Sequence, residues 1–143
     1  MVTGSRTGDF ELDTDKARLD LDVVWSFLST EAYWGRWRTR EVVEAQVASA
    51  WRVIGLYDAD GTLVGFARAV SDGVALGYLA DVFVLPTHRG QGLGRDMVEA
   101  LVSHGPGARM RWLLHTADAH GFYGRLGFSA APTTLMEREA PAR

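Results

Sequence analysis

The sequence contains no cysteine among its 143 residues. A disulfide framework, a thiolate metal site and a cysteine nucleophile are therefore excluded. Lysine is nearly absent as well, since only Lys16 among the fifteen basic residues is a lysine. A phosphate-binding P-loop needs a lysine directly after its last glycine, so this class of nucleotide site is also excluded.

The sequence also lacks an excess of positive charge and a long apolar run. The net charge is -3 and the isoelectric point is about 5.8, so we expect no nucleic-acid partner. Apolar runs stay well short of the roughly 20 residues that a membrane helix needs. The N-terminal residues are polar and lack the apolar centre of a signal peptide. We therefore expect a cytoplasmic protein without membrane contact.

Hydrophobic residues, by contrast, make up 47% of the chain, and aromatic residues 10%. A chain of this size and composition can bury one core, so we expect a single domain at 9–143 behind a flexible tail at 1–8. Periodicity and turn residues predict its elements in chain order. We expect a strand at 10–12, helices from Asp20 or Asp22 to 29 and at 39–50, strands at 53–57, 63–70 and 77–85, a helix at 92–104, a strand at 110–115, a short helix ending at Gly127 and an edge strand at 133–139. This order predicts an α/β fold with one mixed, mostly antiparallel sheet and helices on both faces.

A glycine-rich loop lies where the strand at 77–85 gives way to the next helix. Three glycines, Gly90, Gly92 and Gly94, stand between Arg89 and Arg95. Free N–H groups at a helix start bind anions, and glycines allow close approach, so the loop predicts a pyrophosphate cradle. A tight turn without a ligand is the alternative. The dinucleotide fingerprint does not match, because its third glycine is replaced by Arg95.

Two motifs resemble the GNAT superfamily of N-acetyltransferases. The first is V-x-P-x-x-R-G-x-G-x-G at 84–94, and the second is "AHGFYGRLGF" at 119–128. The resemblance implies that acetyl-coenzyme A, without a metal, lies in a cleft between splayed strands at 77–85 and 110–115. The residues that it assigns to this cosubstrate are Val82, Phe83, Val84, Arg89, Gly90, Gln91, Gly92, Leu93, Gly94 and Arg95.

The resemblance further implies that an amine attacks the thioester directly. Tyr123 would protonate the departing thiolate, and Phe122 would face the core; a packing role for Tyr123 is the alternative. Asp81 interrupts an apolar strand, where a carboxylate is costly unless it is paired or functional. Asp81 could therefore bind the substrate ammonium or receive its proton, or it could form a structural bond to a loop N–H or to an arginine such as Arg68. Strand alternation turns Asp81 away from Tyr78, which is a second candidate near the thioester.

The acceptor side is expected near the aromatic stretch "AYWGRWR" at 32–38. Tyr33, Trp34 and Arg38 are predicted to form a substrate wall, and Tyr78 is a fourth expected substrate-binding residue. The acceptor is expected to be a small-molecule amine. A protein N-terminus or lysine, a non-catalytic coenzyme A sensor and a general nucleotide binder are the alternatives. Histidine spacing predicts no metal site, although His120 could line the acceptor pocket. A homodimer through the expected strand at 133–139 is a further expectation.

Overall fold

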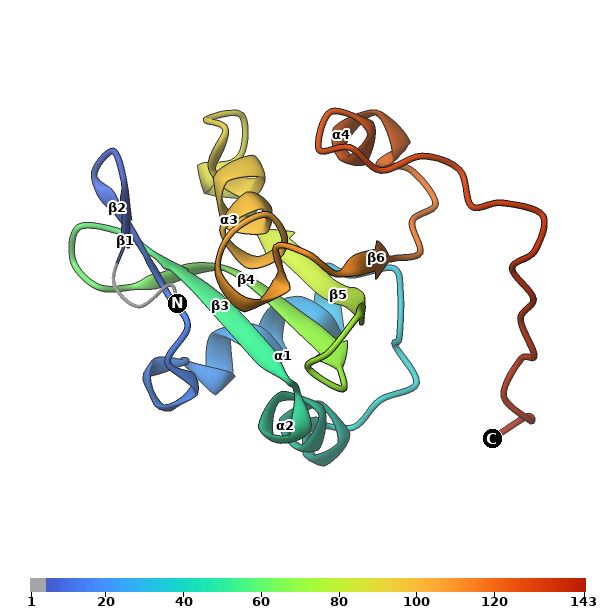
Figure 1. Ribbon diagram of the computed structural model, residues 1–143. Coiled ribbons are helices and arrows are strands. Elements are labelled where there is room, and N and C mark those ends of the chain that lie inside the picture. The colour runs from blue at the N-terminus through green and yellow to red at the C-terminus, as the bar shows by residue number, and fades with distance from the viewer. Residues whose placement is uncertain (1–4) are drawn as a thin grey trace.

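Six strands form one sheet in the computed structural model, which describes residues 5–143 (Figure 1). The strands lie in chain order, and every neighbouring pair is antiparallel except β5 and β6, which are parallel. Their bounds are Ser5–Thr7 (β1), Phe10–Asp13 (β2), Arg52–Tyr57 (β3), Leu63–Ser71 (β4), Leu76–Val84 (β5) and Arg111–Leu113 (β6). The expected mixed, mostly antiparallel sheet is confirmed.

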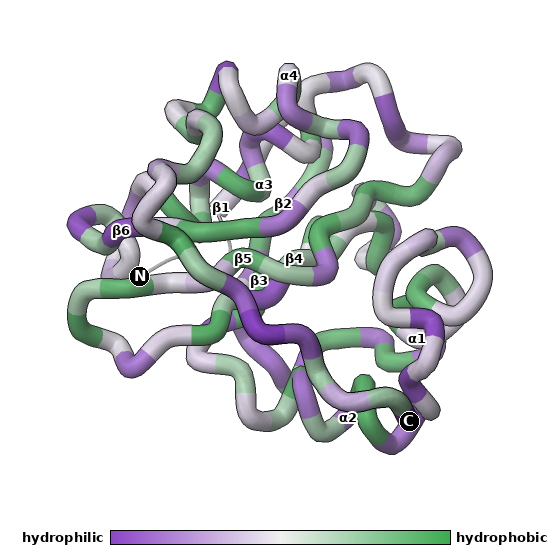
Figure 2. The backbone as a smooth tube through the Cα atoms, turned by 90° about the vertical axis from the view of Figure 1, so that its right-hand side faces the viewer, coloured by the Kyte–Doolittle hydropathy of each residue, from purple (hydrophilic) through white to green (hydrophobic). Residues whose placement is uncertain are grey.

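Helices cover both faces of this sheet. The α-helices are Leu21–Thr30 (α1), Arg40–Ser49 (α2), Leu93–Val102 (α3) and His120–Gly124 (α4), and short 3-10 turns span Lys16–Arg18, Pro86–His88 and Gly105–Gly107. On one face, Phe27 of α1 stacks on Phe83 of β5 with ring centroids 4.1 Å apart. On the other face, Met97 of α3 lies in a buried cluster with Ile54 of β3. Figure 2 shows the apolar stretches of chain concentrated in the sheet between these layers.

Strand β5 carries a β-bulge at Asp81. Phe66 of β4 pairs with Phe83, but Arg68, two residues later, pairs with Ala80, so β5 has one residue more than β4 between these pairs. Asp81 adopts a left-handed backbone with a φ of 54°, unusual for a residue other than glycine. The extra residue reverses the alternation of side chains, which places Asp81 on the same face as Tyr78. The expectation that Asp81 points away from Tyr78 is therefore wrong.

The parallel pair β5 and β6 is joined only at one end. Paired residues run from Leu76 opposite Arg111 to Tyr78 opposite Leu113, and β5 continues to Val84 without β6 beside it. The two strands therefore separate beyond Tyr78, as the resemblance implied. The cavities described below lie at this opening.

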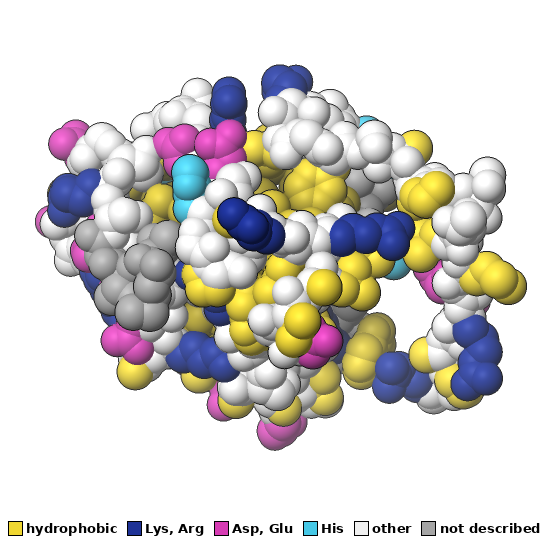
Figure 3. Space-filling view, viewed as in Figure 1, with side chains coloured by type: hydrophobic (Ala, Val, Ile, Leu, Met, Phe, Trp, Pro, Cys, Tyr) yellow, Lys and Arg dark blue, Asp and Glu magenta, His cyan; other side chains and the backbone are white. Residues whose placement is uncertain are grey.

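Both ends of the chain differ from the sequence-based expectation. Ser5–Thr7, assigned to the tail, forms β1 because its backbone pairs with β2; residues 1–4 lie outside the described residues. The edge strand expected at 133–139 does not form, and this segment is exposed without regular structure. The C-terminal stretch 133–143 makes side-chain contacts instead, between Glu137 and His115 and between Arg143 and Trp37, and Figure 3 shows it as an arm beyond an open gap. None of the helices described for residues 5–143 is long and apolar enough to span a membrane.

Candidate active site

One cavity of about 680 Å³ lies between the end of β5 and the start of α3. Its walls include all but one of the residues assigned to acetyl-coenzyme A, namely Val82, Phe83, Val84, Arg89, Gly90, Gly92, Leu93, Gly94 and Arg95. The exception is Gln91, which is exposed and is not part of the wall. The sequence motif therefore marks a real concave site.

The glycine loop leaves the first turn of α3 open to this cavity. Gly92 is the N-cap of the helix, with a φ of 75°, and no side chain caps the free N–H groups. Gly90 has a φ of 81°, and a Cβ added at either glycine would meet no protein atom within 4 Å. The space beside both glycines is thus open, and Arg89 and Arg95 add positive charge around it. Free N–H groups, a helix dipole and arginines are the features that bind a pyrophosphate.

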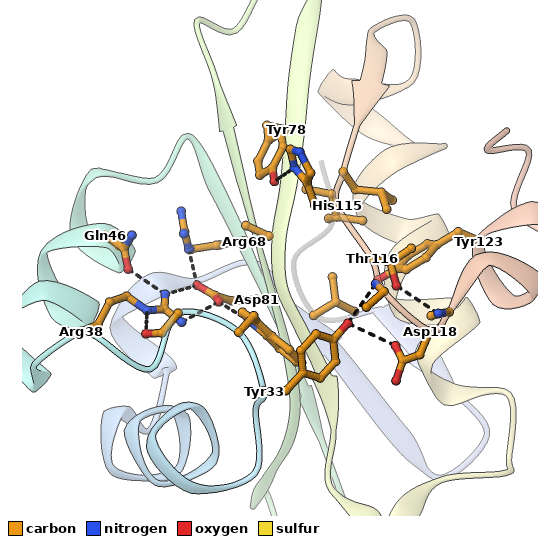
Figure 4. A pocket seen from close by; sticks show the side chains of 18 of the residues that line it. Tyr33, Arg38, Gln46, Arg68, Tyr78, Asp81, His115, Thr116, Asp118 and Tyr123 are labelled. Atoms are coloured by element: carbon orange, nitrogen blue, oxygen red, sulfur yellow. Dashed lines mark hydrogen bonds and ion pairs between the residues drawn. The ribbon is translucent and has the colours of Figure 1, made fainter. Parts of the chain in front are cut away.

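A second cavity, of about 620 Å³, opens on the other side of the β5 bulge (Figure 4). The four predicted substrate residues, Tyr33, Trp34, Arg38 and Tyr78, all line it. Trp37 joins them, and both Tyr33 and Trp37 are 53% exposed. An aromatic wall therefore faces the sheet across the cavity, which suits an acceptor with a flat apolar part.

Asp81 is buried at the base of this second cavity and is held by three side chains. Arg38 donates from Nη1 to Oδ2 at 2.8 Å and from Nη2 to Oδ1 at 3.0 Å. Arg68 donates from Nε to Oδ2 at 2.7 Å, and Trp34 donates from Nε1 to Oδ1 at 2.8 Å. Burial alone would raise the pKa of Asp81, but the two guanidiniums outweigh it and hold the pKa below its usual value. A carboxylate with these partners is a poor proton acceptor, so the geometry favours the paired role over the base.

All three guanidinium nitrogens of Arg38 are engaged in structural bonds. Besides Asp81, its Nη1 contacts Gln46 Oε1 at 2.8 Å and its Nε contacts the carbonyl of Gly35 at 2.9 Å. Its side chain is only 4% exposed. Arg38 thus shapes the substrate wall without offering a free charge to a ligand.

A chain of three polar side chains runs from Tyr78 to the exposed rim. The Tyr78 hydroxyl lies 2.5 Å from Nδ1 of His115, and Nε2 of His115 lies 3.0 Å from Oε2 of Glu137. Burial raises the pKa of Tyr78, an effect that Arg68 opposes. The chain links the cavity floor to an exposed carboxylate, which is an arrangement that can pass a proton outward.

Tyr123 lies where the two cavities meet. Burial, followed by the neighbouring Tyr33 and Asp118, raises the pKa of Tyr123 to about 12, so its hydroxyl is protonated at neutral pH. Among the described residues this hydroxyl has no hydrogen-bond partner. The expected division between a buried Phe122 and a free Tyr123 is not observed, because both rings are half-buried, pack edge to face and line the first cavity.

The residues of the second cavity that sequence reasoning missed include Trp37, Arg68 as a cavity residue, His115 and Asp118. Arg68 carried a usable signal, because an arginine in the apolar run "LVGFARAV" is as unusual as Asp81 in its own strand. His120, in contrast, lines neither cavity. Within residues 5–143 no group of three or more histidines or carboxylates is arranged to hold a metal ion.

The site combines two features: a pair of parallel strands that separate from each other, and a helix between them that begins at a glycine-rich loop. Together these features define a class of acyl-transfer fold. Residues 21–128 match the acetyltransferase (GNAT) family, and this chain belongs to that family. A Gibberella zeae protein classed as an acetyltransferase, FG08082, is 33% identical over 84% of this chain and 79% of its own length. Serotonin N-acetyltransferase 2 of Oryza sativa is 40% identical over 52% of this chain, but the match spans only 38% of that enzyme.

Solved structures agree with this assignment. A GNAT family crystal structure from Xanthomonas campestris pv. campestris is 36% identical, with a TM-score of 0.85 over 92% of this chain and 94% of that one. A Deinococcus radiodurans structure, 22% identical with a TM-score of 0.70 over 98% of this chain and all of that one, shares the fold.

Proposed function

We propose that this protein transfers the acetyl group of acetyl-coenzyme A to the primary amine of a small molecule. One observation carries the proposal: the anion-binding cavity and the aromatic cavity share a boundary. The residues that line both are Tyr33, Trp34, Val82, Asp118, Ala119 and Tyr123. A thioester reaching along β5 would therefore meet an amine at Val82 and Tyr123. The rice relative is named for serotonin, which supports a small-molecule amine as acceptor.

The amine nitrogen attacks the thioester carbonyl, so that a C–N bond forms and the C–S bond then breaks. The bulge at Asp81 interrupts the regular pairing of β5 beside Val82. We assign the Val82 N–H to the developing oxyanion, because a bulge leaves backbone groups outside the ladder. Tyr123 donates its hydroxyl proton to the departing thiolate and regains a proton from solvent; its raised pKa of about 12 keeps the hydroxyl protonated at neutral pH before the transfer.

We assign the removal of the amine proton to Tyr78 and His115, which line the same cavity, with solvent in the cavity carrying the proton from the amine at Val82 to Tyr78. Glu137 accepts the Nε2–H of His115, which leaves the Nδ1 lone pair facing the Tyr78 hydroxyl. As Tyr78 receives the amine proton, its own proton moves to Nδ1, so the charge ends on the His115–Glu137 pair. This path replaces Asp81, whose carboxylate is already bonded to Arg38, Arg68 and Trp34.

The test combines cosubstrate binding with product detection. Calorimetry measures coenzyme A binding, and thiol release with mass spectrometry detects acetylated products from a panel of small amines and from peptides. We expect binding together with small-amine products. Binding without any product would support a non-catalytic sensor, and products from peptides alone would support a protein acetyltransferase. Equal stabilisation by ATP, NAD and coenzyme A would contradict a specific coenzyme A site.

A further inference from the structure

Arg68 presents a nearly buried guanidinium to the aromatic cavity with most of its donors unused. Its side chain is 11% exposed, and it lines the cavity wall. A guanidinium has five N–H groups. In Arg68 the Nε–H bonds to Asp81, and the terminal nitrogens have no partner among the described residues. Figure 4 shows this difference from Arg38, whose bonds extend to Gln46 and Asp81.

The charges at the base of this cavity do not balance. Arg38 and Arg68 contribute two positive charges and Asp81 one negative charge, which leaves a net charge of one positive unit. The other carboxylate of the cavity wall, Asp118, is exposed. The pair of His115 and Glu137 beside the cavity is also exposed, with side chains 66% and 58% exposed. A buried cation without a full counter-charge is costly, and a ligand anion would remove that cost.

We propose that the acceptor is an amino carboxylate and that Arg68 binds its carboxylate. The inference rests on the proposed acetyl transfer and names the acceptor class of the same site. A carboxylate offers one negative charge and two oxygens, which match the spare charge and the paired donors of Arg68. A phosphomonoester, with a charge of about -1.5 to -2, would exceed that spare charge.

The strand register sets the size of this acceptor. Arg68 lies opposite Ala80, and Val82, at the boundary of the two cavities, is two residues further along β5. Two residues of regular strand span roughly 7 Å, and the bulge at Asp81 shortens this step, so the carboxylate and the reacting amine are separated by only a few bonds. The exposed rings of Tyr33 and Trp37 would contact the rest of the acceptor. These features favour an amino acid with a flat or apolar side chain.

The experiment compares amines that differ only in a carboxylate. Phenylalanine is paired with phenethylamine and tryptophan with tryptamine, and kcat/KM is measured by thiol release. Because a hydrogen bond to a charged group is worth about 1.5–3 kcal/mol, we expect the carboxylated member to be favoured by at least about 10-fold. Equal rates within both pairs would overturn the inference while leaving acetyl transfer intact. Preference for O-phosphoethanolamine over β-alanine would overturn it in favour of a phosphate.

The variant Arg68→Gln keeps a donor for Asp81 but removes the charge. We expect its KM for phenylalanine to rise about 10-fold or more relative to its KM for phenethylamine. Loss of folded protein would lower both rates together, so the ratio isolates the carboxylate contact. The matched control is Arg109→Gln, an exposed arginine outside both cavities.

A binding measurement keeps the test independent of turnover. Calorimetry with N-acetylphenylalanine and N-acetylphenethylamine should show tighter binding of the carboxylated product by wild type and no preference in Arg68→Gln. If no amine is acetylated, this result still supports the anion site while the proposed function fails. If the two products bind equally to wild type, the assignment of Arg68 is wrong.

Discussion

Arg38 and Asp81, which are 43 residues apart in the sequence, form a bidentate ion pair, with Nη1–Oδ2 and Nη2–Oδ1 distances of 2.8 and 3.0 Å. The pair ties the aromatic loop to the β5 bulge, and both side chains are almost fully buried, at 4% and 3% exposed. We expect Asp81→Asn to lower the free energy of unfolding by about 3 kcal/mol or more, because the guanidiniums of Arg38 and Arg68 would lose their buried counter-charge. Chemical denaturation measures this loss. Asp118→Asn, which removes an exposed carboxylate of the same cavity, should change stability little.

The same pair predicts a pH dependence of stability. The pKa of Asp81 is lowered in the folded protein, so its ionisation stabilises the fold above its unfolded pKa of about 3.9. That stabilisation decreases as the pH falls through the lower folded pKa. The difference in stability between wild type and Asp81→Asn should therefore be constant near neutrality and shrink below about pH 4. A difference that shrinks near pH 6 would contradict the lowered pKa.

Gly90 and Gly61 provide a matched pair for testing the cosubstrate loop. Both have a φ of 81°, and an added Cβ would meet no protein atom within 4 Å at either position. Alanine at either position should cost about 1–2 kcal/mol of stability, because both backbones are left-handed. Gly90 faces the cosubstrate cavity, whereas Gly61 lies in the turn between β3 and β4. We expect only Gly90→Ala to raise the KM for acetyl-coenzyme A, by about 10-fold. An equal KM in both variants would remove the loop from the site.

His115 is predicted to accept the amine proton relayed by Tyr78. Replacement by glutamine removes the ring nitrogen that faces the Tyr78 hydroxyl, and kcat should fall about 10²-fold, the low end for a positioned acid or base. The control is His120→Gln, since His120 lines neither cavity. Steady-state kinetics with saturating acetyl-coenzyme A measures both variants. A similar, small effect of the two substitutions would show that solvent accepts the proton.

The sequence alone was sufficient to predict the helix caps and the turn before β4, because the residues that form each of them lie close together in the chain. Asp20 caps α1 through the N–H groups of Asp22 and Val23, and Thr39 caps α2 through the N–H of Val42, both as expected from residue type. The turn before β4 was also visible, because Asp58 accepts bonds from the N–H groups of the residues that follow it. These signals lie within a few residues of the structure they specify.

The site depended on contacts that no local pattern contains. The bulge at Asp81 is fixed by side chains that approach from Trp34, Arg38 and Arg68, and a continuous apolar run gives no sign of it. The alternation rule therefore turned Asp81 to the wrong face. The segment at 133–139 shows the opposite error, because strand-like alternation does not form a strand without a partner edge.

Arg52 is a buried cation whose terminal nitrogens have no hydrogen-bond partner in the described part of the chain. Burial lowers the pKa of Arg52, and the centroid of the Trp51 ring lies 5.8 Å from its Cζ, near the limit of a cation–π contact. Arg52→Met keeps an unbranched stem out to the position of the arginine Nε and removes the unpaired charge. We expect the free energy of unfolding to rise by about 1–3 kcal/mol.

Arg18 offers the contrasting case for Arg52. Arg18 contacts Glu11 and Asp13 at 2.9 and 3.0 Å and lies over the Tyr57 ring at 3.8 Å. Arg18→Met should therefore lower stability or leave it unchanged. Urea denaturation of both variants provides the comparison, and a loss of stability in Arg52→Met would mean that its guanidinium has a partner such as a bound water or anion.

Tyr123→Phe should lower kcat about 10²-fold while the KM for acetyl-coenzyme A stays nearly constant. The phenylalanine ring retains the edge-to-face contacts with Phe122 and Phe128, so the packing of α4 is preserved. The substitution removes a hydroxyl that has a pKa of about 12, and is therefore protonated at neutral pH, and that lies at the boundary of the two cavities.

The matched control is Tyr57→Phe. Burial also raises the pKa of Tyr57 to about 12. Tyr57 lies on β3, however, and its buried hydroxyl has no hydrogen-bond partner in residues 5–143. A phenol effect that is general to buried tyrosines would appear in both variants, whereas a proton donor at the thioester sulfur predicts loss of kcat in Tyr123→Phe alone. Full turnover of that variant with an acceptor whose chemical step limits the rate would show that the thiolate leaves without a donated proton.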